Sequence, residues 1–300
     1  MPESRLGSTR RRYDVLGAIT VTGGLVALVY AISRAPEDGW TATRTLALLA
    51  VSAVLLAGFV VGEARAEAPL LPLRLLRLQT LAGSNAVGFL LGASFYSFIF
   101  IGTLYMQQVL GYSAMKTGLA WLATSVTGIA LAGPAQALVT RASAKLVMAS
   151  GMAMVGAGIL WATQVPTDGH FWGNLAGPLF VTDAVTWAFI PVSIGALAGV
   201  TERNAGVASG LIDTSQQIGG AIGIAVASTI AAARSRVLLG QGRAAAAALT
   251  GGFHWALWVS GLIGLAAIPV AILLVRRSEI AQAVAATAVQ RPAPTPAPGS

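Results

Sequence analysis

The run over residues 78–115 reads LQTLAGSNAVGFLLGASFYSFIFIGTLYMQQVLGYSAM and contains no charged residue. A helix needs roughly 20 mainly apolar residues to cross the hydrocarbon core of a bilayer, so this run is long enough to span one. It belongs to a chain of 300 residues in which 55% are hydrophobic and only 10% are charged. Soluble proteins average about 25% charged residues. So few charges cannot cover a water-exposed surface, and the sequence therefore predicts an all-α membrane protein, a polytopic helical bundle.

Seven further apolar runs predict seven more spanning helices, which gives about eight transmembrane helices. They cover residues 15–32, 46–62, 117–140, 146–167, 171–201, 204–233 and 253–275. A single charged residue interrupts each of two runs, Asp183 in 171–201 and Asp213 in 204–233. We expect a short polar turn from Arg34 to Trp40 and a looser connection over 234–252.

The basic residues lie mainly between these runs and predict how the chain crosses the membrane. Cytoplasmic segments of membrane proteins carry an excess of Lys and Arg. With both ends in the cytoplasm, six of the 19 Lys and Arg face the other side, namely Arg34, Arg44, Lys116, Arg234, Arg236 and Arg243. The larger cytoplasmic share predicts a multi-pass protein of the cell membrane with both termini inside. Because the basic residues form no continuous face, the net charge of +8 does not predict nucleic-acid binding.

Asp183 and Asp213 are candidates for proton coupling, because a carboxylate inside a spanning helix is costly and usually faces a cavity or a partner. Loss of hydration favours the protonated form of a carboxyl group. A group that takes up and releases a proton can link transport to a proton gradient. The alternative is that each carboxylate makes a static hydrogen bond to a neighbouring helix.

Small and polar residues share one face of the helix predicted over 204–233. They recur at spacings of three and four, as Gly206, Gly210, Asp213, Gln217 and Gly220. Small residues let another helix approach closely, which predicts a packed seam that contains Asp213 and Gln217. Gly219 and Gly223 mark a neighbouring stripe for close packing.

Four polar residues in the apolar runs are candidates for a substrate cavity: Asn85, Tyr96, Gln216 and Gln217. The sequence contains no H-E-x-x-H, G-x-S-x-G or G-x-x-x-x-G-K-[ST] motif and no cysteine. We therefore predict no enzymatic activity, no cofactor and no metal site. One enzymatic alternative is an intramembrane aspartyl protease that uses Asp183 and Asp213. It requires a tyrosine before the first and a G-x-G-D context at the second, and both are missing.

Four stretches point, in order, to one known family. They are RYDVLGA at 12–18, APLLPLRL at 68–75, LYMQQVLGYS at 104–113 and ASGLIDTSQQIGGA at 208–221. The last closely resembles a signature of the 14-helix drug:proton antiporters of the major facilitator superfamily. The other three look like the start of that family's seventh helix, the link after its eighth and the end of its ninth. The resemblance covers roughly residues 10–275 and is specific because it is collinear.

The resemblance implies half of a major facilitator fold plus two extra helices. The expected parts are a basic cytoplasmic segment (1–13), two central extra helices (14–63), a cytoplasmic link (64–77), the six-helix C-terminal half (78–276) and a disordered cytoplasmic tail (277–300). Six N-terminal helices of the family are absent, so the resemblance implies a truncated chain. Arg141 and Lys145 resemble the basic loop that steers the family's cytoplasmic gate, without its usual glycine. The family usually has Asn in place of Asp213 and a small residue in place of Asp183.

The resemblance also implies a function, namely proton-coupled efflux of drug-like or small organic compounds. The partners would be the lipid bilayer, a small-molecule substrate and protons, with the missing N-terminal six helices or a second copy completing the transporter. The alternative is a non-transporting membrane interaction partner, or an inactive fragment, that packs through the glycine seam.

Overall fold

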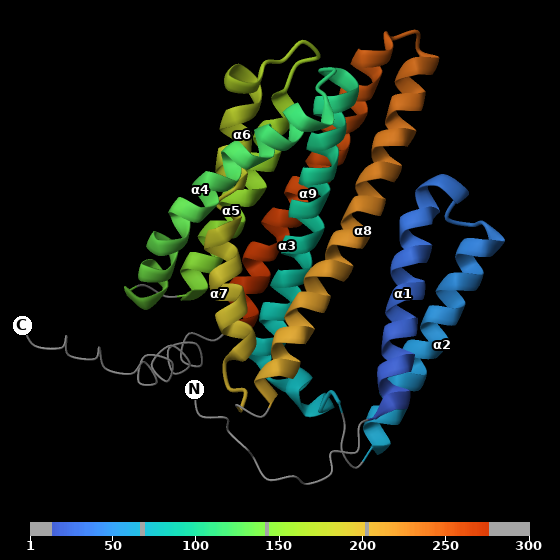
Figure 1. Cartoon of the computed structure of the whole chain (residues 1–300), viewed down its shortest axis with the longest axis vertical. Helices are drawn as coiled ribbons and strands as arrows, with labels where there is room; N and C mark the ends of the chain where they lie inside the picture. The colour runs from blue at the N-terminus through green and yellow to red at the C-terminus, as the bar shows by residue number, and fades with distance from the viewer. Residues whose placement is uncertain (1–13, 67–69, 142–143, 202–203, 276–300) are drawn as a thin grey trace, which may run out of the picture. The chain divides into compact units, whose positions relative to one another are not determined.

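The computed structural model describes residues 14–66, 70–141, 144–201 and 204–275. The predicted basic segment 1–13 and the predicted tail 277–300 lie outside the described residues. The helices are α1 (Val15–Asp38), α2 (Thr43–Arg65), α3 (Gln79–Leu104), α4 (Ala114–Arg141), α5 (Ala144–Trp161), α6 (Ala176–Thr182), α7 (Val185–Leu197), α8 (Ala205–Gly240) and α9 (Ala245–Leu274) (Figure 1). Short 3-10 turns occur at Leu73–Arg77 and Ala162–Gln164, and π-helical turns occur at Tyr105–Val109 and Phe171–Leu175.

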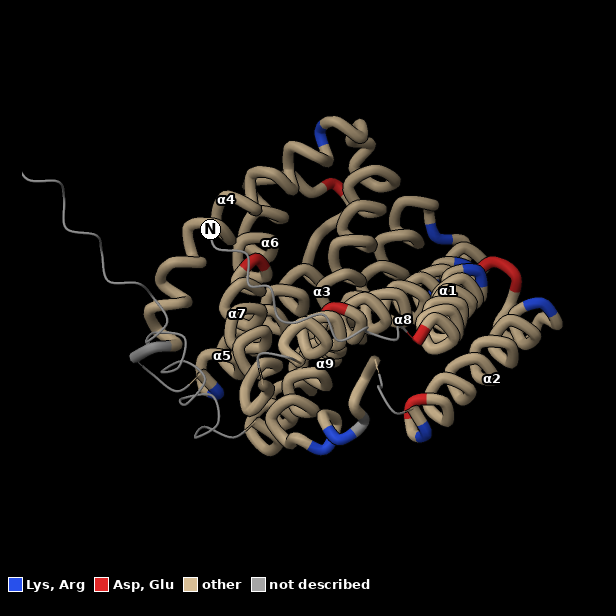
Figure 2. Tube along the Cα trace, turned by 60° about the horizontal axis from the view of Figure 1, so that its bottom comes forward, with Lys and Arg blue, Asp and Glu red and all other residues tan. Residues whose placement is uncertain are grey.

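Eight helical segments of the described chain are long and apolar enough to cross a membrane, with α6 and α7 together forming one of them, Phe171–Leu197. The prediction of an all-α bundle with about eight spanning helices is therefore confirmed. Figure 2 shows long stretches of the chain without charged positions, as lipid-facing and buried helix surfaces require.

The predicted residue bounds of two connections between helices are wrong. The segment 234–252 is mostly helical, because α8 continues to Gly240 and α9 already begins at Ala245. Five alanines from Ala244 to Ala248 favour helix, and the turn between the two helices is short, with Gly242 at φ 79°. Likewise α1 continues past Arg34 to Asp38, and the chain turns at Gly39, whose φ is 99°.

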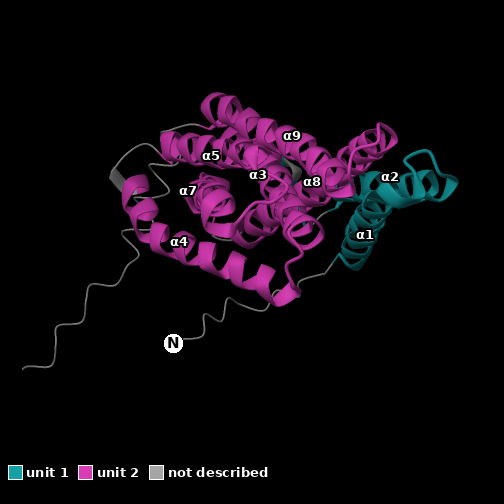
Figure 3. Cartoon of the chain, turned by 90° about the horizontal axis from the view of Figure 1, so that it is seen from above, with its two compact units in different colours: residues 1–75 teal, residues 76–300 magenta. Residues whose placement is uncertain are grey.

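The chain divides into two compact units, residues 1–75 and 76–300 (Figure 3). The first unit contains α1 and α2, which pack along each other. At Gly24 of α1 an added Cβ would overlap the side chain of Leu56. The buried Ser52 hydroxyl of α2 donates a hydrogen bond of 2.8 Å to the Gly24 carbonyl oxygen. The missing side chain at Gly24 therefore allows the close approach of the two helices.

The second unit is built around α3. In the view from above, α3 lies in the middle of this unit, with α5, α7, α8 and α9 around it (Figure 3). Its fully buried side chains include Leu81, Val87, Phe98 and Ile101. The α4 helix lies at the edge of the unit beside α7, and large apolar side chains such as Ile129, 77% exposed, cover its outer face. That outer face suits contact with lipid.

Candidate functional site

Three glycines bring α3 and α8 into direct backbone contact. A Cβ added at Gly92 of α3 would overlap the main-chain carbonyl of Gln216. In the same way, a Cβ at Gly219 would overlap the backbone of Phe89, and one at Gly223 the backbone of Ala93. No side-chain rotation relieves an overlap with a backbone atom. The relative position of the two helices therefore depends on these residues having no side chain.

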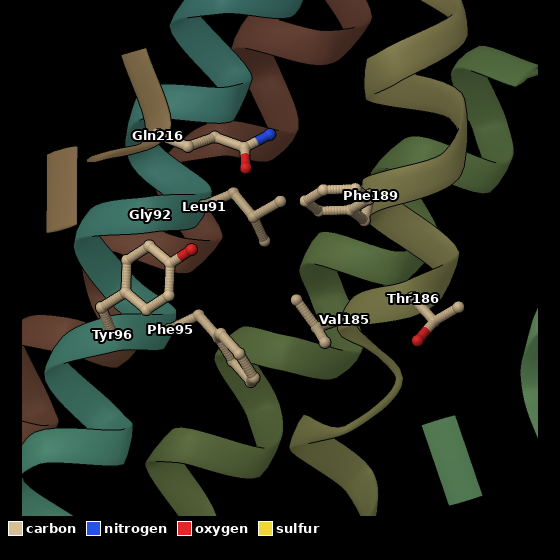
Figure 4. A pocket seen from close by; sticks show the side chains of 8 residues that line it. All are labelled: Leu91, Gly92, Phe95, Tyr96, Val185, Thr186, Phe189 and Gln216. Carbon is tan, nitrogen blue, oxygen red and sulfur yellow. The ribbon is translucent and has the colours of Figure 1, made fainter. Parts of the chain in front are cut away.

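The contact between α3 and α8 forms one wall of a half-open cavity of about 240 Å³, and α7 forms the facing wall. Its lining residues are Leu91, Gly92, Phe95 and Tyr96 of α3, Val185, Thr186 and Phe189 of α7, and Gln216 of α8 (Figure 4). In the close view the side chains of Leu91 and Phe189 point toward each other across the gap. The Gln216 side chain extends from α8 toward the same gap.

The cavity wall is mainly hydrocarbon with a few polar groups. Three of its side chains are aromatic, and no charged residue of the described chain lines it. Among the lining residues, Tyr96, Thr186 and Gln216 have polar side chains. A concave, largely apolar site with a small number of polar groups is the usual form of a small-molecule site.

A helix break with a carboxylate lies beside this cavity. The span Phe171–Leu197 is interrupted near its middle, where α6 ends at Thr182 and α7 begins at Val185. Asp183 occupies the break, and its Oδ2 atom accepts a hydrogen bond of 3.0 Å from the backbone N–H of Gly128 on α4. Asp183 therefore connects the peripheral α4 helix to the interrupted span.

Gly128 makes this contact possible because it has no side chain. A Cβ added there would lie 3.1 Å from Asp183 Oδ2 and 3.3 Å from Thr186 Oγ1. Thr186 is also a lining residue of the cavity. Thr186 therefore lies both beside the Asp183 carboxylate contact and in the cavity wall. It follows Asp183 by three positions on the same span.

Two of the four predicted cavity residues, Tyr96 and Gln216, line the cavity. The other two lie elsewhere. Asn85 accepts a hydrogen bond of 2.8 Å from the Ser215 hydroxyl and so ties α3 to α8 outside the cavity lining. Gln217 is exposed on α8, because it points about 100° around the helix from Gln216.

The predicted seam along Gly206, Gly210, Asp213 and Gln217 is not formed among the described helices of the second unit. A Cβ built on Gly206 or Gly210 meets no described atom within 4 Å, and Asp213 is exposed. Gly220, assigned to the same face, instead approaches α3, where an added Cβ would overlap the ring of Tyr96. The helix packs through the stripe with Gly219 and Gly223, which leaves the face with Asp213 open.

The two basic residues predicted to form a gate loop lie on consecutive helices. Arg141 is the last residue of α4, and Lys145 lies in the first turn of α5. Residues 142 and 143 between these helices are outside the described part of the chain. The gate role of Arg141 and Lys145 stays a prediction.

The sequence did not predict Gly128 as the partner of Asp183, nor the six other lining residues, which are Leu91, Gly92, Phe95, Val185, Thr186 and Phe189. Aromatic residues in an apolar run show no contrast with their neighbours, so nothing in the sequence distinguishes those that line a cavity. The one available signal was the spacing of three residues between Asp183 and Thr186, which would put both on one side of a continuous helix.

Comparison with known proteins gives one matching family and several relatives. A sequence model described as Major Facilitator Superfamily matches residues 13–224. The chain is 35% identical to the cephamycin export protein of Amycolatopsis lactamdurans over 227 residues, which cover 74% of this chain and 46% of the relative. It is 27% identical to the puromycin resistance protein of Streptomyces alboniger over 299 residues, 96% of this chain and 59% of the relative.

A third relative is the tetracenomycin C resistance and export protein of Streptomyces glaucescens, 29% identical over 240 residues, 78% of this chain and 44% of the relative. The chain thus spans about half the length of the curated relatives it matches. All three relatives come from bacteria.

Proposed function

This chain belongs to the major facilitator superfamily. We propose that it forms one half of a proton-coupled exporter of small organic compounds. The proposal rests on one observation, namely that the hydrogen bond between Asp183 and Gly128 lies next to the cavity wall. Thr186 lines the cavity and lies beside the point where Asp183 meets Gly128. A protonation change at Asp183 would therefore act directly on the wall of the cavity.

Asp183 suits proton coupling because its two protonation states have different hydrogen-bonding capacity. The ionised carboxylate only accepts, as it does from the Gly128 amide, whereas the protonated group can also donate. In transporters of this kind, interrupted helices often form the substrate and ion sites near the membrane midplane. We propose that proton uptake at Asp183 weakens the contact with α4 and so alters access to the cavity.

The exposed face of α8 that carries Asp213 favours a further partner that packs against it. It carries the exposed Asp213 within a spanning helix, and a carboxylate there is costly against lipid. We propose that a second six-helix half, or a second copy of the chain, covers this face and encloses a polar pathway. Asp213 is then the second candidate for proton coupling. The names of the three relatives support export, and neither the interaction-partner reading nor the protease reading is favoured.

Dye efflux from bacterial cells tests the proposal. We expect no efflux from cells that express the 300-residue chain alone, and proton-dependent efflux of uncharged aromatic dyes once it is joined to the N-terminal half of a relative. A protonophore should abolish that efflux. Efflux that persists after collapse of the proton gradient would contradict proton coupling. Absence of efflux for every dye, with the fused protein present in the membrane, would contradict the export function.

The orientation can be tested directly because the chain contains no cysteine. We propose that both termini are cytoplasmic, which places the turn between α8 and α9 outside and the end of α2 inside. A membrane-impermeant maleimide should label Gly242→Cys in intact cells and should label Ala66→Cys only after the cells are opened. The reverse labelling pattern would show that the chain is inserted the other way round.

A further inference from the structure

Three arginines lie around the turn between α8 and α9. Arg234 and Arg236 are in the last turns of α8, and Arg243 follows the turn to α9 (Figure 1), on the side that the predicted topology places outside the cytoplasm. Arg34 and Glu37 form the only ion pair among the described residues, so none of the three arginines has a carboxylate partner there. Their charges are available to an anion that the described chain does not supply.

Arg234 differs from the other two because an aromatic ring holds it in place. Its guanidinium carbon lies 5.6 Å from the centre of the Trp255 ring on α9, within the range of a cation–π contact. That contact uses the face of the ring and satisfies no N–H group. The two terminal nitrogens of Arg234 form no hydrogen bond with a described residue and are not enclosed, because Nε is its only nitrogen that is buried without a partner. Arg234 therefore offers positioned and accessible N–H donors.

Trp255 marks the edge of the hydrocarbon core on α9. This helix has 30 residues and ends at Leu274, and a span of about 20 residues that ends there begins at Trp255. Tryptophan is enriched at this level in membrane proteins, because its ring is apolar and its N–H group is polar. The Arg234 guanidinium, which lies over that ring, is therefore at the level of the phospholipid headgroups.

An apolar stripe of Trp258 and Leu262 continues from Trp255 along α9 into the hydrocarbon core. The spacings of three and four residues put both on the same face of the helix as Trp255, and all three side chains are exposed. The rise from Trp255 to Leu262 is about 10 Å, which fits within one leaflet of a core about 30 Å thick. A cation at the headgroup level next to a strip of hydrocarbon matches the anionic phosphate and the acyl chain of one phospholipid.

We propose that Arg234, Trp255 and the apolar stripe form a binding site for an acidic phospholipid, in the leaflet nearest the α8–α9 turn. The terminal N–H groups of Arg234 donate to the headgroup phosphate, a charge-assisted contact that suits the fork of a guanidinium. One acyl chain lies along Trp258 and Leu262. The inference goes beyond the proposed function, since it requires only that the chain lies in a membrane.

The net charge of the headgroup decides which phospholipid is preferred. Phosphatidylglycerol carries one negative charge, whereas in phosphatidylcholine the choline group balances the phosphate. Residues 234–252 contain three arginines and no Asp or Glu, so the surroundings of the site are positive. We expect about a fivefold preference for phosphatidylglycerol, which corresponds to the attraction of one basic residue at a membrane surface.

A fluorophore on the apolar stripe measures this preference at the site itself. The chain contains no cysteine, so Leu262→Cys gives one position for labelling with bimane. The labelled chain is placed in phosphatidylcholine vesicles that contain a small fraction of nitroxide-labelled phosphatidylglycerol or phosphatidylcholine, and a nitroxide quenches bimane only at close range. Quenching at position 262 should need about fivefold less of the labelled phosphatidylglycerol. At Ile129→Cys, on the exposed face of α4, both lipids should quench alike.

Two arginine variants, each made together with Leu262→Cys, assign the preference to one side chain. Arg234→Gln removes the positioned guanidinium and should abolish the preference for phosphatidylglycerol. Arg236→Gln is the matched control, because it removes the same charge two positions along α8, from an exposed side chain whose Nε donates to the Ala232 carbonyl oxygen. It should keep the preference. Unchanged quenching by phosphatidylcholine in both variants shows that the stripe is intact.

Three results would overturn the inference. One is equal quenching by the two lipids at position 262, a comparison that needs no arginine variant. Another is an equal loss of the preference in Arg236→Gln, which would show a diffuse attraction and not a site. The third is reversal of the quenching by excess inorganic phosphate, which would show that the site takes a free phosphate and not a lipid. None of these results bears on the efflux experiment, which measures transport.

Discussion

Gly92→Ala is expected to destabilise the second unit, by about 1–3 kcal/mol, although alanine is the better helix former. The added methyl group would overlap the Gln216 carbonyl oxygen, so α3 and α8 must move apart along their whole contact. That separation also loosens the packing at Gly219 and Gly223 on the facing helix. Thermal melts of the purified chain in detergent, followed by tryptophan fluorescence, should show the loss as a lower melting temperature.

Gly210→Ala is the matched control for this prediction. It makes the same chemical change on α8, but its Cβ would meet no described atom within 4 Å. Helix propensity alone then predicts a small gain, up to about 1 kcal/mol. A destabilisation of Gly210→Ala equal to that of Gly92→Ala would contradict the assignment of the α3–α8 contact. It would support instead the seam that the sequence pattern predicted.

Asp183→Asn is expected to reduce proton-driven efflux to background in the exporter completed with an N-terminal half. Asparagine keeps a side-chain oxygen that can accept from the Gly128 amide, so α4 should stay attached to the interrupted span. It cannot take up a proton, so the switch between accepting and donating is lost. Dye uptake into inverted vesicles under an imposed pH gradient measures the loss.

Two further variants make the Asp183 result specific. Asp168→Asn makes the same change in the turn before Phe171, outside the spanning helices, and should leave efflux unchanged. Asp213→Asn tests the second carboxylate in the same assay. If Asp183→Asn transports normally while Asp213→Asn does not, proton coupling belongs to the open face of α8, and the role proposed for Asp183 is wrong.

The sequence predicts the spanning helices well, because each one needs a long uncharged run that few other structures require. The run over residues 78–115 contains α3 and the π-helical turn that follows it, and the two intramembrane aspartates are visible as isolated charges. Helix ends are predicted less well. The alanines before Leu249 carry no hydrophobic contrast, so the start of α9 could be found only from helix propensity.

The candidate site was predictable only in part, because spacing along one helix shows which residues share a face and not what that face contacts. Gly206, Gly210, Asp213 and Gly220 look equivalent by spacing, yet only Gly220 meets α3. The partner of Asp183 is even less accessible from sequence. A backbone amide has no residue type, and Gly128 lies 55 positions away along the chain.

Different atoms set the position of the cavity walls and the chemistry of the cavity surface. Main-chain atoms at Gly92, Gly219 and Gly223 set the spacing of the two helices. The side chains of Leu91, Phe95 and Phe189 line the cavity and take no part in that backbone contact. Substitutions among the lining residues can therefore change the shape of the cavity without moving the two helices. The lining side chains can therefore be exchanged one at a time, whereas any side chain added at one of the three glycines would force the two helices apart.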